Sequence, residues 1–222
     1  MTWLMRRAGI FASAHVPAAA GGGAEIEFQE PRGDSANASS HNFTTVAIGA
    51  ASSDRRVVVA CAYRGGGPIT GVTIGGVSAA LDVAQSTANS AEIWSAIVPT
   101  GTTATVAIAL TGAGSGMGIG VWRVVGDPVD TATMSPTNQS TVNLSLDTQS
   151  GDVCIAVVSA RVTSPPPVMS WSAATGRYAA DWDGFARTHA GGDLVASGAS
   201  ADMGGSLTNF SIDAAAVAVA YR

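Results

Sequence analysis

The chain has 222 residues, of which 46% are hydrophobic and only 12% are charged, with a formal net charge of −5. This length allows one large domain or two small ones, and the charged fraction is about half of the roughly 25% usual for soluble domains. A nucleic-acid-binding protein would show a basic face, whereas the eleven arginines form only two adjacent pairs, Arg6-Arg7 and Arg55-Arg56, so we expect no nucleic-acid partner.

Residues 1–23 combine a few large apolar side chains with a run of small ones. His15 and Pro17 interrupt the apolar stretch, which argues against a signal peptide. No part of the chain approaches the ~18 consecutive apolar residues that cross a membrane, so we expect no membrane partner. We predict that residues 1–23 form an arm that anchors the protein on a neighbouring chain, with packing on its own domain as the alternative. The apolar residues assigned to this anchoring are Trp3, Leu4, Ile10 and Phe11.

Residues 24–126 show the period-two alternation and short apolar runs that are typical of β-strands. The run at 56–63, RVVVACAY, is almost wholly apolar and predicts a central strand covered on both faces. Gly75-Gly76 separates two β-rich runs and predicts a hairpin, because primed turns need positive φ. The expected strands are 24–29, 43–48, 56–63, 70–74, 77–83, 91–98, 103–111 and 117–125.

The second half of the chain has the same character after a connector. Residues 127–140 are rich in Thr, Ser, Pro and Asn, and we interpret them as a link between two β-units, 24–126 and 141–222. Three consecutive prolines, Pro165 to Pro167, predict an extended segment outside any ladder. The expected strands are 142–146, 152–160, 169–172, 177–180, 193–197 and 214–221.

A weak internal repeat links the two halves. Residues 45–48 and 56–60 align with 141–144 and 152–156 at an ungapped offset of 96, and 121–123 resemble 220–222 at an offset of 99. A duplicated β-unit explains the repeat, as does chance similarity between Val- and Ala-rich strands. We predict an all-β protein of the β-sandwich or jelly-roll type, either two tandem sandwiches or two halves of one.

Four sequence blocks carry a resemblance to a known group of proteins. They are RRVVVACAYR at 55–64, TGVTIGGVSA at 70–79, AEIWSAIVPTGTTATVAIALT at 91–111 and GVWRVVG at 120–126. In this order they resemble phage and prophage structural proteins of alphaproteobacterial type, and the surface fibre and spike components of gene-transfer-agent particles. The resemblance runs over about residues 40–222. It implies a virion location, a surface role as a head spike, decoration or tail fibre, homo-oligomers and virion proteins as partners, and no catalytic residues.

A search for catalytic patterns gives little. The string closest to G-x-S-x-G is Gly76-Val77-Ser78-Ala79-Ala80, in the predicted hairpin with no helix after it. There is no H-x-x-x-H or C-x-x-C string, and the absence of lysine excludes a P-loop. We therefore expect no enzymatic activity, no metal and no cofactor. Cys61 and Cys154 lie in apolar runs and are predicted to be buried thiols, with a disulfide left open for neighbouring strands.

Aromatic residues after the prolines support an alternative function. They stand in a Gly- and Asp-rich stretch, where exposed rings could stack on sugar rings of a host surface glycan or on a partner protein. They could equally fill the open end of a sandwich. In the carbohydrate-binding (lectin-like) alternative, the contact residues are Trp171, Tyr178, Trp182 and Phe185.

Overall fold

The computed structural model describes residues 23–135, 138–162, 168–182, 187–208 and 211–222. Within these ranges the chain forms strands and no helix, which confirms the prediction of an all-β, sandwich-like fold. None of the described residues belongs to a helix that could cross a membrane. The predicted anchoring residues Trp3, Leu4, Ile10 and Phe11 lie outside the described residues.

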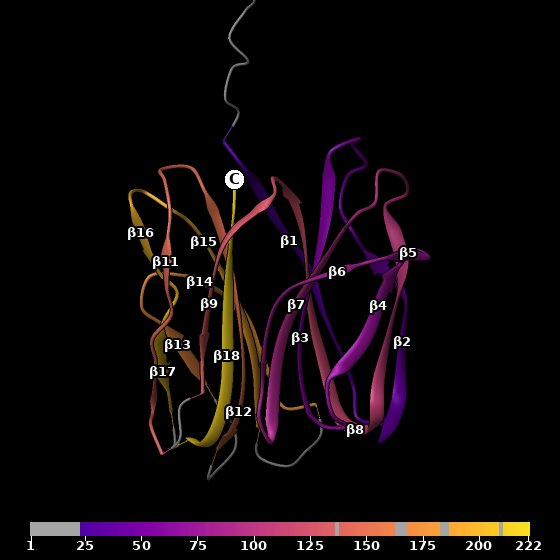
Figure 1. Cartoon of the computed structure of the whole chain (residues 1–222), viewed down its shortest axis with the longest axis vertical. Helices are drawn as coiled ribbons and strands as arrows, with labels where there is room; N and C mark the ends of the chain where they lie inside the picture. Colours follow the sequence, from indigo (N-terminus) through magenta and orange to yellow (C-terminus); the bar gives the residue numbers. More distant parts are fainter. Residues whose placement is uncertain (1–22, 136–137, 163–167, 183–186, 209–210) are drawn as a thin grey trace, which may run out of the picture.

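The first half of the chain, called the first unit here, folds into two sheets that share one long strand (Figure 1). The inner sheet has the order β6-β7-β3-β8-β1, and the outer sheet has the order β5-β4-β8-β2. The strands are β1 (Glu25–Asp34), β2 (Ala38–Ala47), β3 (Arg55–Gly65), β4 (Ile69–Ile74), β5 (Val77–Ser78), β6 (Ala80–Ser86), β7 (Asn89–Ile97) and β8 (Thr103–Val125).

Strand β8 belongs to both sheets because it changes partners along its length. Its first part pairs with β2 and β4, and its second part pairs with β1 and β3. The sequence predicts two strands here, 103–111 and 117–125. The structure instead continues the strand through the glycine-rich stretch between them, where Gly116 has a positive φ of 64°.

The second unit repeats this plan. Its inner sheet has the order β14-β15-β12-β18-β9, and short strands form its outer layer in the orders β10-β17-β13 and β11-β16. The strands are β9 (Pro128–Met134), β10 (Thr141–Val142), β11 (Ser145–Asp147), β12 (Val153–Val162), β13 (Met169–Trp171), β14 (Thr175–Ala180), β15 (Arg187–Val195), β16 (Ser200–Asp202), β17 (Gly205–Leu207) and β18 (Ser211–Tyr221).

The two inner sheets have equivalent strand orders, β1-β8-β3-β7-β6 in the first unit and β9-β18-β12-β15-β14 in the second. The first strand of each unit pairs with its last strand, which pairs with the central strand, β3 or β12. The order then continues to the penultimate long strand and ends at the strand before it, β6 or β14. This shared topology supports the duplicated β-unit predicted from the sequence.

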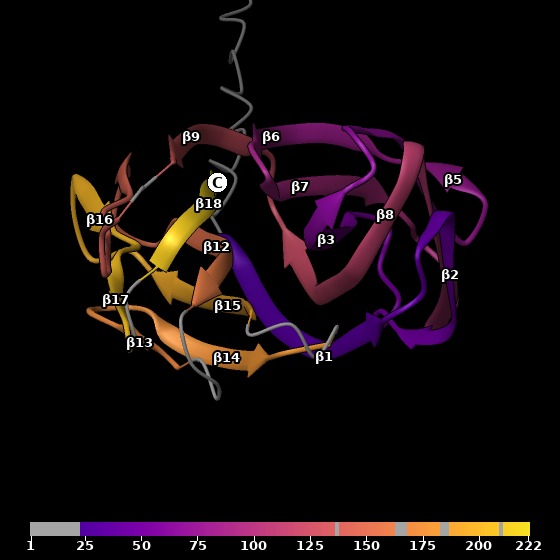
Figure 2. The same cartoon turned by 90° about the horizontal axis from the view of Figure 1, so that it is seen from below.

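The inner sheets pack face to face, so that the molecule has four layers with the outer sheets on either side (Figures 1 and 2). In the middle, β3 lies against β12; to one side, β7 lies against β18 and β6 against β9. On the other side, β8 contacts β15 and β1 contacts β14. The central strands thus face each other, and each remaining strand faces the counterpart of the strand at the same distance on the opposite side of its own sheet, as in a two-fold symmetric dimer fused into one chain.

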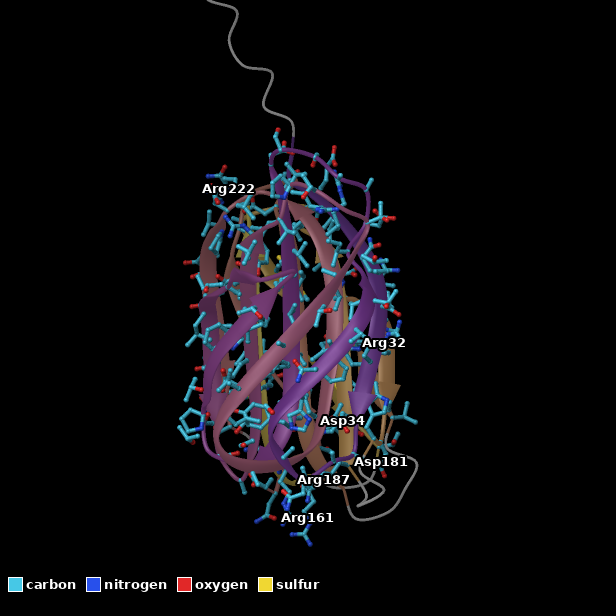
Figure 3. All side chains as sticks on the ribbon, turned by 90° about the vertical axis from the view of Figure 1, so that its right-hand side faces the viewer. Arg32, Asp34, Arg161, Asp181, Arg187 and Arg222 are labelled. Carbon is cyan, nitrogen blue, oxygen red and sulfur yellow. The ribbon has the colours of Figure 1, made fainter. Side chains whose placement is uncertain are left out.

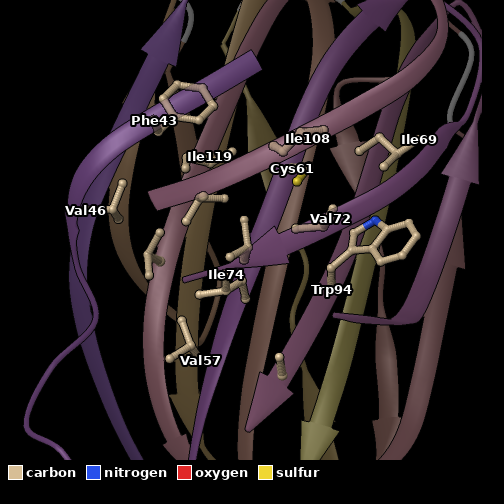
Figure 4. Close-up of a cluster of buried hydrophobic side chains, with 14 of the residues drawn as sticks. Phe43, Val46, Val57, Cys61, Ile69, Val72, Ile74, Trp94, Ile108 and Ile119 are labelled. Atoms are coloured by element: carbon tan, nitrogen blue, oxygen red, sulfur yellow. The ribbon is translucent and has the colours of Figure 1, made fainter. Parts of the chain in front are cut away.

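Three apolar cores follow from these layers. One fills the first unit between its sheets and includes Val57, Ile108 and Trp94 (Figure 4). A second fills the second unit, and a third lies between the inner sheets and draws residues from both units. The strand β3 is buried on both faces because it contributes alternately to the first and third cores, as its continuous apolar run predicts.

Two further features differ from the sequence prediction. The predicted connector, 127–140, contains the edge strand β9, whose alternating Thr residues suit a half-exposed strand and whose Pro128 stands at its first position. The 96-residue alignment pairs Val57 with Val153, but Val57 faces the core of the first unit and Val153 faces the interface. Successive residues of a strand face opposite sides, and in β12 it is Cys154, not Val153, that faces the core of its own unit as Val57 does. The offset between equivalent residues of β3 and β12 is therefore odd, and the even offset of 96 is wrong for this strand. The offset of 99 fits, since Trp122 and Tyr221 both face the interface.

Candidate functional site

The predicted aromatic contact residues divide between the interior and the surface edge. Tyr178 lies between the two units, with its ring centroid 6.1 Å from that of Phe28, 6.2 Å from that of Trp122 and 5.8 Å from that of Trp182. Tyr178 and Trp182 therefore belong to an aromatic cluster at the interface and do not form an open stacking platform. Phe185 lies outside the described residues.

Glycines on the first unit make room for Trp182. A Cβ atom added at Gly33 or at Gly118 would lie 2.1 Å from the indole ring. The ring also stacks on His189, with centroids 5.6 Å apart. The glycines stand far from Trp182 in the sequence, so the inward orientation of this ring depends on how the sheets pack.

Trp171 is half-buried at the open edge of the second unit. Its indole lies over Gly176 and Gly192 of the inner sheet and packs against the core of this unit. Trp171 also lines a hollow of about 220 Å³ together with Met169, Arg177 and Tyr178. Of the predicted glycan-contact residues that are described, Trp171 is the one that lines surface hollows on both of its sides.

A larger groove, of about 390 Å³, crosses the outer sheet of the second unit. The ladder places Thr141 opposite Ser206 and Ser206 opposite Ser170, so three exposed hydroxyl side chains form a row across β10, β17 and β13. Trp171 and Gly205 complete the lining. The polar residues around the groove are Thr141, Asn143, Ser170, Ser172, Asp202 and Ser206.

The Asp202 carboxylate is held in a fixed position at this groove. Its Oδ1 accepts a hydrogen bond from the Gly204 backbone N–H at 2.8 Å. The single hydroxyl proton of Ser172 is shared between the Gly204 carbonyl oxygen, at 2.8 Å, and Asp202 Oδ2, at 3.2 Å. Glycine is required at position 204, since an added Cβ would lie 2.4 Å from the Val142 carbonyl oxygen. The groove thus has one oriented carboxylate and no basic side chain in its lining.

The first unit has a groove at the corresponding place. It measures about 280 Å³ and crosses β2, β8 and β4, where Asn42 stands opposite Ala107 and Ala107 opposite Thr73. The side chains of β8 that face this groove are small, those of Ala107 and Ala109. The two outer grooves therefore share a location in the duplicated fold, but only that of the second unit contains a carboxylate and a full row of hydroxyls.

Buried ionisable groups serve structural contacts. Within the first unit, Glu92 accepts hydrogen bonds from Tyr63 Oη at 2.5 Å and from Trp94 Nε1 at 2.8 Å. Burial, followed by the hydrogen bond to Glu92, raises the pKa of Tyr63. Between the units, Tyr221 Oη donates to Asp82 Oδ2 at 2.8 Å, and burial raises the pKa of Asp82.

Two buried histidines, His41 and His189, interact with charged residues at one end of the molecule. Figure 3 labels Asp34, Asp181, Arg187 and Arg161 at this end. His41 Nδ1 is 2.8 Å from Asp34 Oδ2, and the pKa of Asp34 is lowered mainly by the backbone N–H of Ala36 and then by His41. Both ring nitrogens of His189 are buried without a hydrogen-bonding partner among the described residues. Sequence reasoning missed this histidine because its environment comes from both units.

No three His, Cys, Asp or Glu side chains among the described residues could together hold a metal ion. Cys61 and Cys154 are free and lie in separate cores. The open polar features are the two outer grooves and the hollow beside Trp171. No family model, curated protein or solved structure matches this chain.

Proposed function

We propose that this protein is a non-enzymatic structural component of the surface of a phage-like particle, such as a head spike, a decoration or part of a tail fibre. Residues 1–23 attach it to other virion proteins or to further copies of itself. The duplicated sandwich forms the body that the particle displays.

The observation that supports this proposal is the placement of the polar groups. The buried carboxylates of Glu92 and Asp193 and the half-buried carboxylate of Asp82 hydrogen-bond to side chains inside one unit or across the interface. The outer sheets expose hydroxyl and amide side chains above shallow grooves. A body stabilised in this way offers surface for contact with partners, and the resemblance of its sequence blocks to virion proteins agrees with such a role.

The arm is tested by replacing Trp3, Leu4, Ile10 and Phe11 with serine in the full chain. The variant should keep the thermal unfolding midpoint of the wild type, because the body is unchanged, and should fail to join particles or oligomers. Light scattering and co-sedimentation with particles measure this. The matched control replaces Ala8, Ala12 and Ala14 of the same arm with serine and should assemble normally. Normal incorporation of the first variant would contradict the role of the arm.

Carbohydrate binding is the second candidate function, and a specific observation favours it. The outer groove of the second unit combines hydroxyl, carboxamide and carboxylate groups beside Trp171. Binding through Tyr178 and Trp182 is disfavoured, since their rings pack between the units. Replacing Trp182 by alanine should therefore lower the stability of the interface, and a thermal unfolding measurement on this variant distinguishes that role from a direct ligand contact.

A further inference from the structure

We infer that the outer groove of the second unit is a binding site for a neutral saccharide, which it holds through Asn143 and Asp202. The inference deepens the second candidate function, carbohydrate binding. It rests on the proposed surface role in one respect: this outer sheet must be exposed to the surrounding solution. It assigns the site to the face of β10, β17 and β13, whose lining includes Trp171 of the predicted aromatic residues but not Tyr178 or Trp182.

The groove is shallow and open, and it has the volume of a small-ligand site. Its volume of about 390 Å³ falls within the range of ligand pockets, roughly 300–1,000 Å³. Gly205 on its floor carries no side chain, while Asn143 and Ser172 stand on the flanking segments. The hydroxyls of Thr141, Ser206 and Ser170 are separated by the spacing between neighbouring strands, about 4.8 Å. A ligand lying across the strands would meet a polar group at each one.

The polar groups match the hydroxyls of a saccharide. A hydroxyl both donates and accepts a hydrogen bond, and so do the hydroxyls and the carboxamide of this lining. The backbone N–H of Asn143 donates to Met134 Sδ, while its carboxamide has no hydrogen-bonding partner among the described residues. The Asp202 carboxyl group is already oriented by the Gly204 backbone N–H, so a ligand hydroxyl would meet an acceptor that needs little reorganisation.

Charge separates neutral saccharides from other ligand classes. The lining has one carboxylate and no basic side chain, and the whole chain has a net charge of −5. Nucleic acids and sulfated or sialylated glycans need cationic contacts, which this groove does not offer. The groove also lies on the face of a sheet, whereas an extended peptide that adds a strand needs a free edge. A neutral polyhydroxylated ligand remains as the occupant that the groove suits.

The first unit supplies an internal control for the experiment. Its groove has the same place in the fold and contains Asn42, but the central strand presents Ala107 and Ala109 to it in place of a hydroxyl. The exposed Ser206 and Ala109 both stand on the central strand of their outer sheets, so a tyrosine at either position blocks one groove without removing a buried contact. Tyrosine is also favoured on strands.

The full chain is probed on an array of neutral oligosaccharides that contain glucose, galactose, mannose and N-acetylglucosamine, with sialylated and sulfated glycans beside them. A bound oligosaccharide is then titrated by calorimetry. Asn143→Ala should lower the affinity about fivefold or more, because a carboxamide contact is lost, and Ser206→Tyr should abolish binding. Asn42→Ala and Ala109→Tyr should bind as the wild type does. Equal thermal unfolding midpoints show that each variant is folded.

Three results would overturn the inference: no binding to any neutral oligosaccharide, preference for the charged glycans, or equal losses from the paired variants of the two grooves. Arm-dependent incorporation into particles is measured separately with the same Ser206→Tyr variant. If that variant is incorporated normally and does not bind saccharide, the site is distinguished from the structural role. If the wild type binds saccharide and never joins a particle, the site stands and the proposed virion role fails.

Discussion

Trp122 Nε1 donates a hydrogen bond to Asp193 Oδ2 over 2.7 Å and thereby joins the two units across their buried interface. Arg177 donates to both oxygens of the same carboxylate, at 2.7 and 2.8 Å. The counterpart of Trp122 in the second unit, Tyr221, donates to Asp82 of the first unit. Each unit therefore presents an aromatic donor to a carboxylate of the other, and the interface includes polar as well as apolar contacts.

Replacing Asp193 with alanine removes the acceptor shared by Trp122 and Arg177. The buried indole N–H then loses its partner and the guanidinium loses its bidentate contact, so we expect the free energy of unfolding to fall by about 3 kcal/mol. Urea unfolding followed by tryptophan fluorescence measures the change. The control is Asp147→Ala, at an exposed position of β11, which should shift the midpoint little. Equal midpoints for the two variants would show that the Asp193 contact does not stabilise the interface.

Arg55 stabilises the loops at one end of the first unit. It is fully buried, and its guanidinium donates to the carbonyl oxygens of Val98, Gly49, Gly101 and Thr100 at 2.7–2.8 Å. Lysine has three donors on one nitrogen and cannot reach four carbonyls spread around a planar group. We expect Arg55→Lys to lower the free energy of unfolding by about 2 kcal/mol, measured by urea denaturation. Arg64→Lys, at an exposed position, serves as the control and should leave it unchanged.

The elements that depend on local chemistry could be predicted from the sequence. Gly75 and Gly76 have φ values of 60° and 82° and connect Ile74 to Val77, as the predicted hairpin requires. The apolar run of β3 correctly indicates burial on both faces. Strand β9 was missed because its Thr-rich, Pro-initiated sequence is equally typical of a loop, and its strand conformation comes from pairing with β18.

The candidate site depends on contacts between distant segments and could not be predicted. The hydroxyl row exists because the strand pairing aligns Thr141 with Ser206 and Ser206 with Ser170. No local sequence pattern predicts this register. Trp182 turns inward because Gly33 and Gly118 leave space for it on another sheet. Composition therefore identifies aromatic and hydroxyl residues, while the packing of the sheets decides which of them remain open to a ligand.

The stability of the interface should fall in mild acid because of His189. Burial, and after it the charge of Arg187, lowers the pKa of His189 from 6.5 to about 4, with Asp181 opposing the shift. The unfolded chain thus binds a proton at pH values where the folded chain does not, so stability falls as the pH drops from about 6.5 to about 4. The expected loss over this window is about 3 kcal/mol. Urea unfolding at successive pH values measures it.

The contribution of His189 is isolated by comparing the wild type with His189→Phe and His189→Gln. Both variants remove the titrating ring, so the slope of stability against pH between 4 and 6.5 should become shallower in each. Two variants are used because the ring contacts Trp182 and the space near Gly118 is narrow. Carboxylates such as Asp34, whose pKa is lowered, lose their stabilising contribution as the pH falls below about 4. This further loss of stability should be seen in all three proteins. An unchanged slope in both variants would rule out His189 as the source.

Cys61 and Cys154 should remain unreactive thiols in the folded protein. They lie in the separate cores of the two units, which leaves no route to a disulfide without unfolding. Burial raises the pKa of Cys154 to about 12 and raises that of Cys61 as well, so neither forms the thiolate that reacts with disulfide reagents. Labelling with an aromatic disulfide should therefore be negligible under native conditions and reach both thiols in denaturant. A Ser78→Cys variant, at an exposed position of β5, should react at once. Fast labelling of the wild type at neutral pH would mean that one core opens readily, and the order in which the two thiols react under increasing urea would then identify the less stable unit.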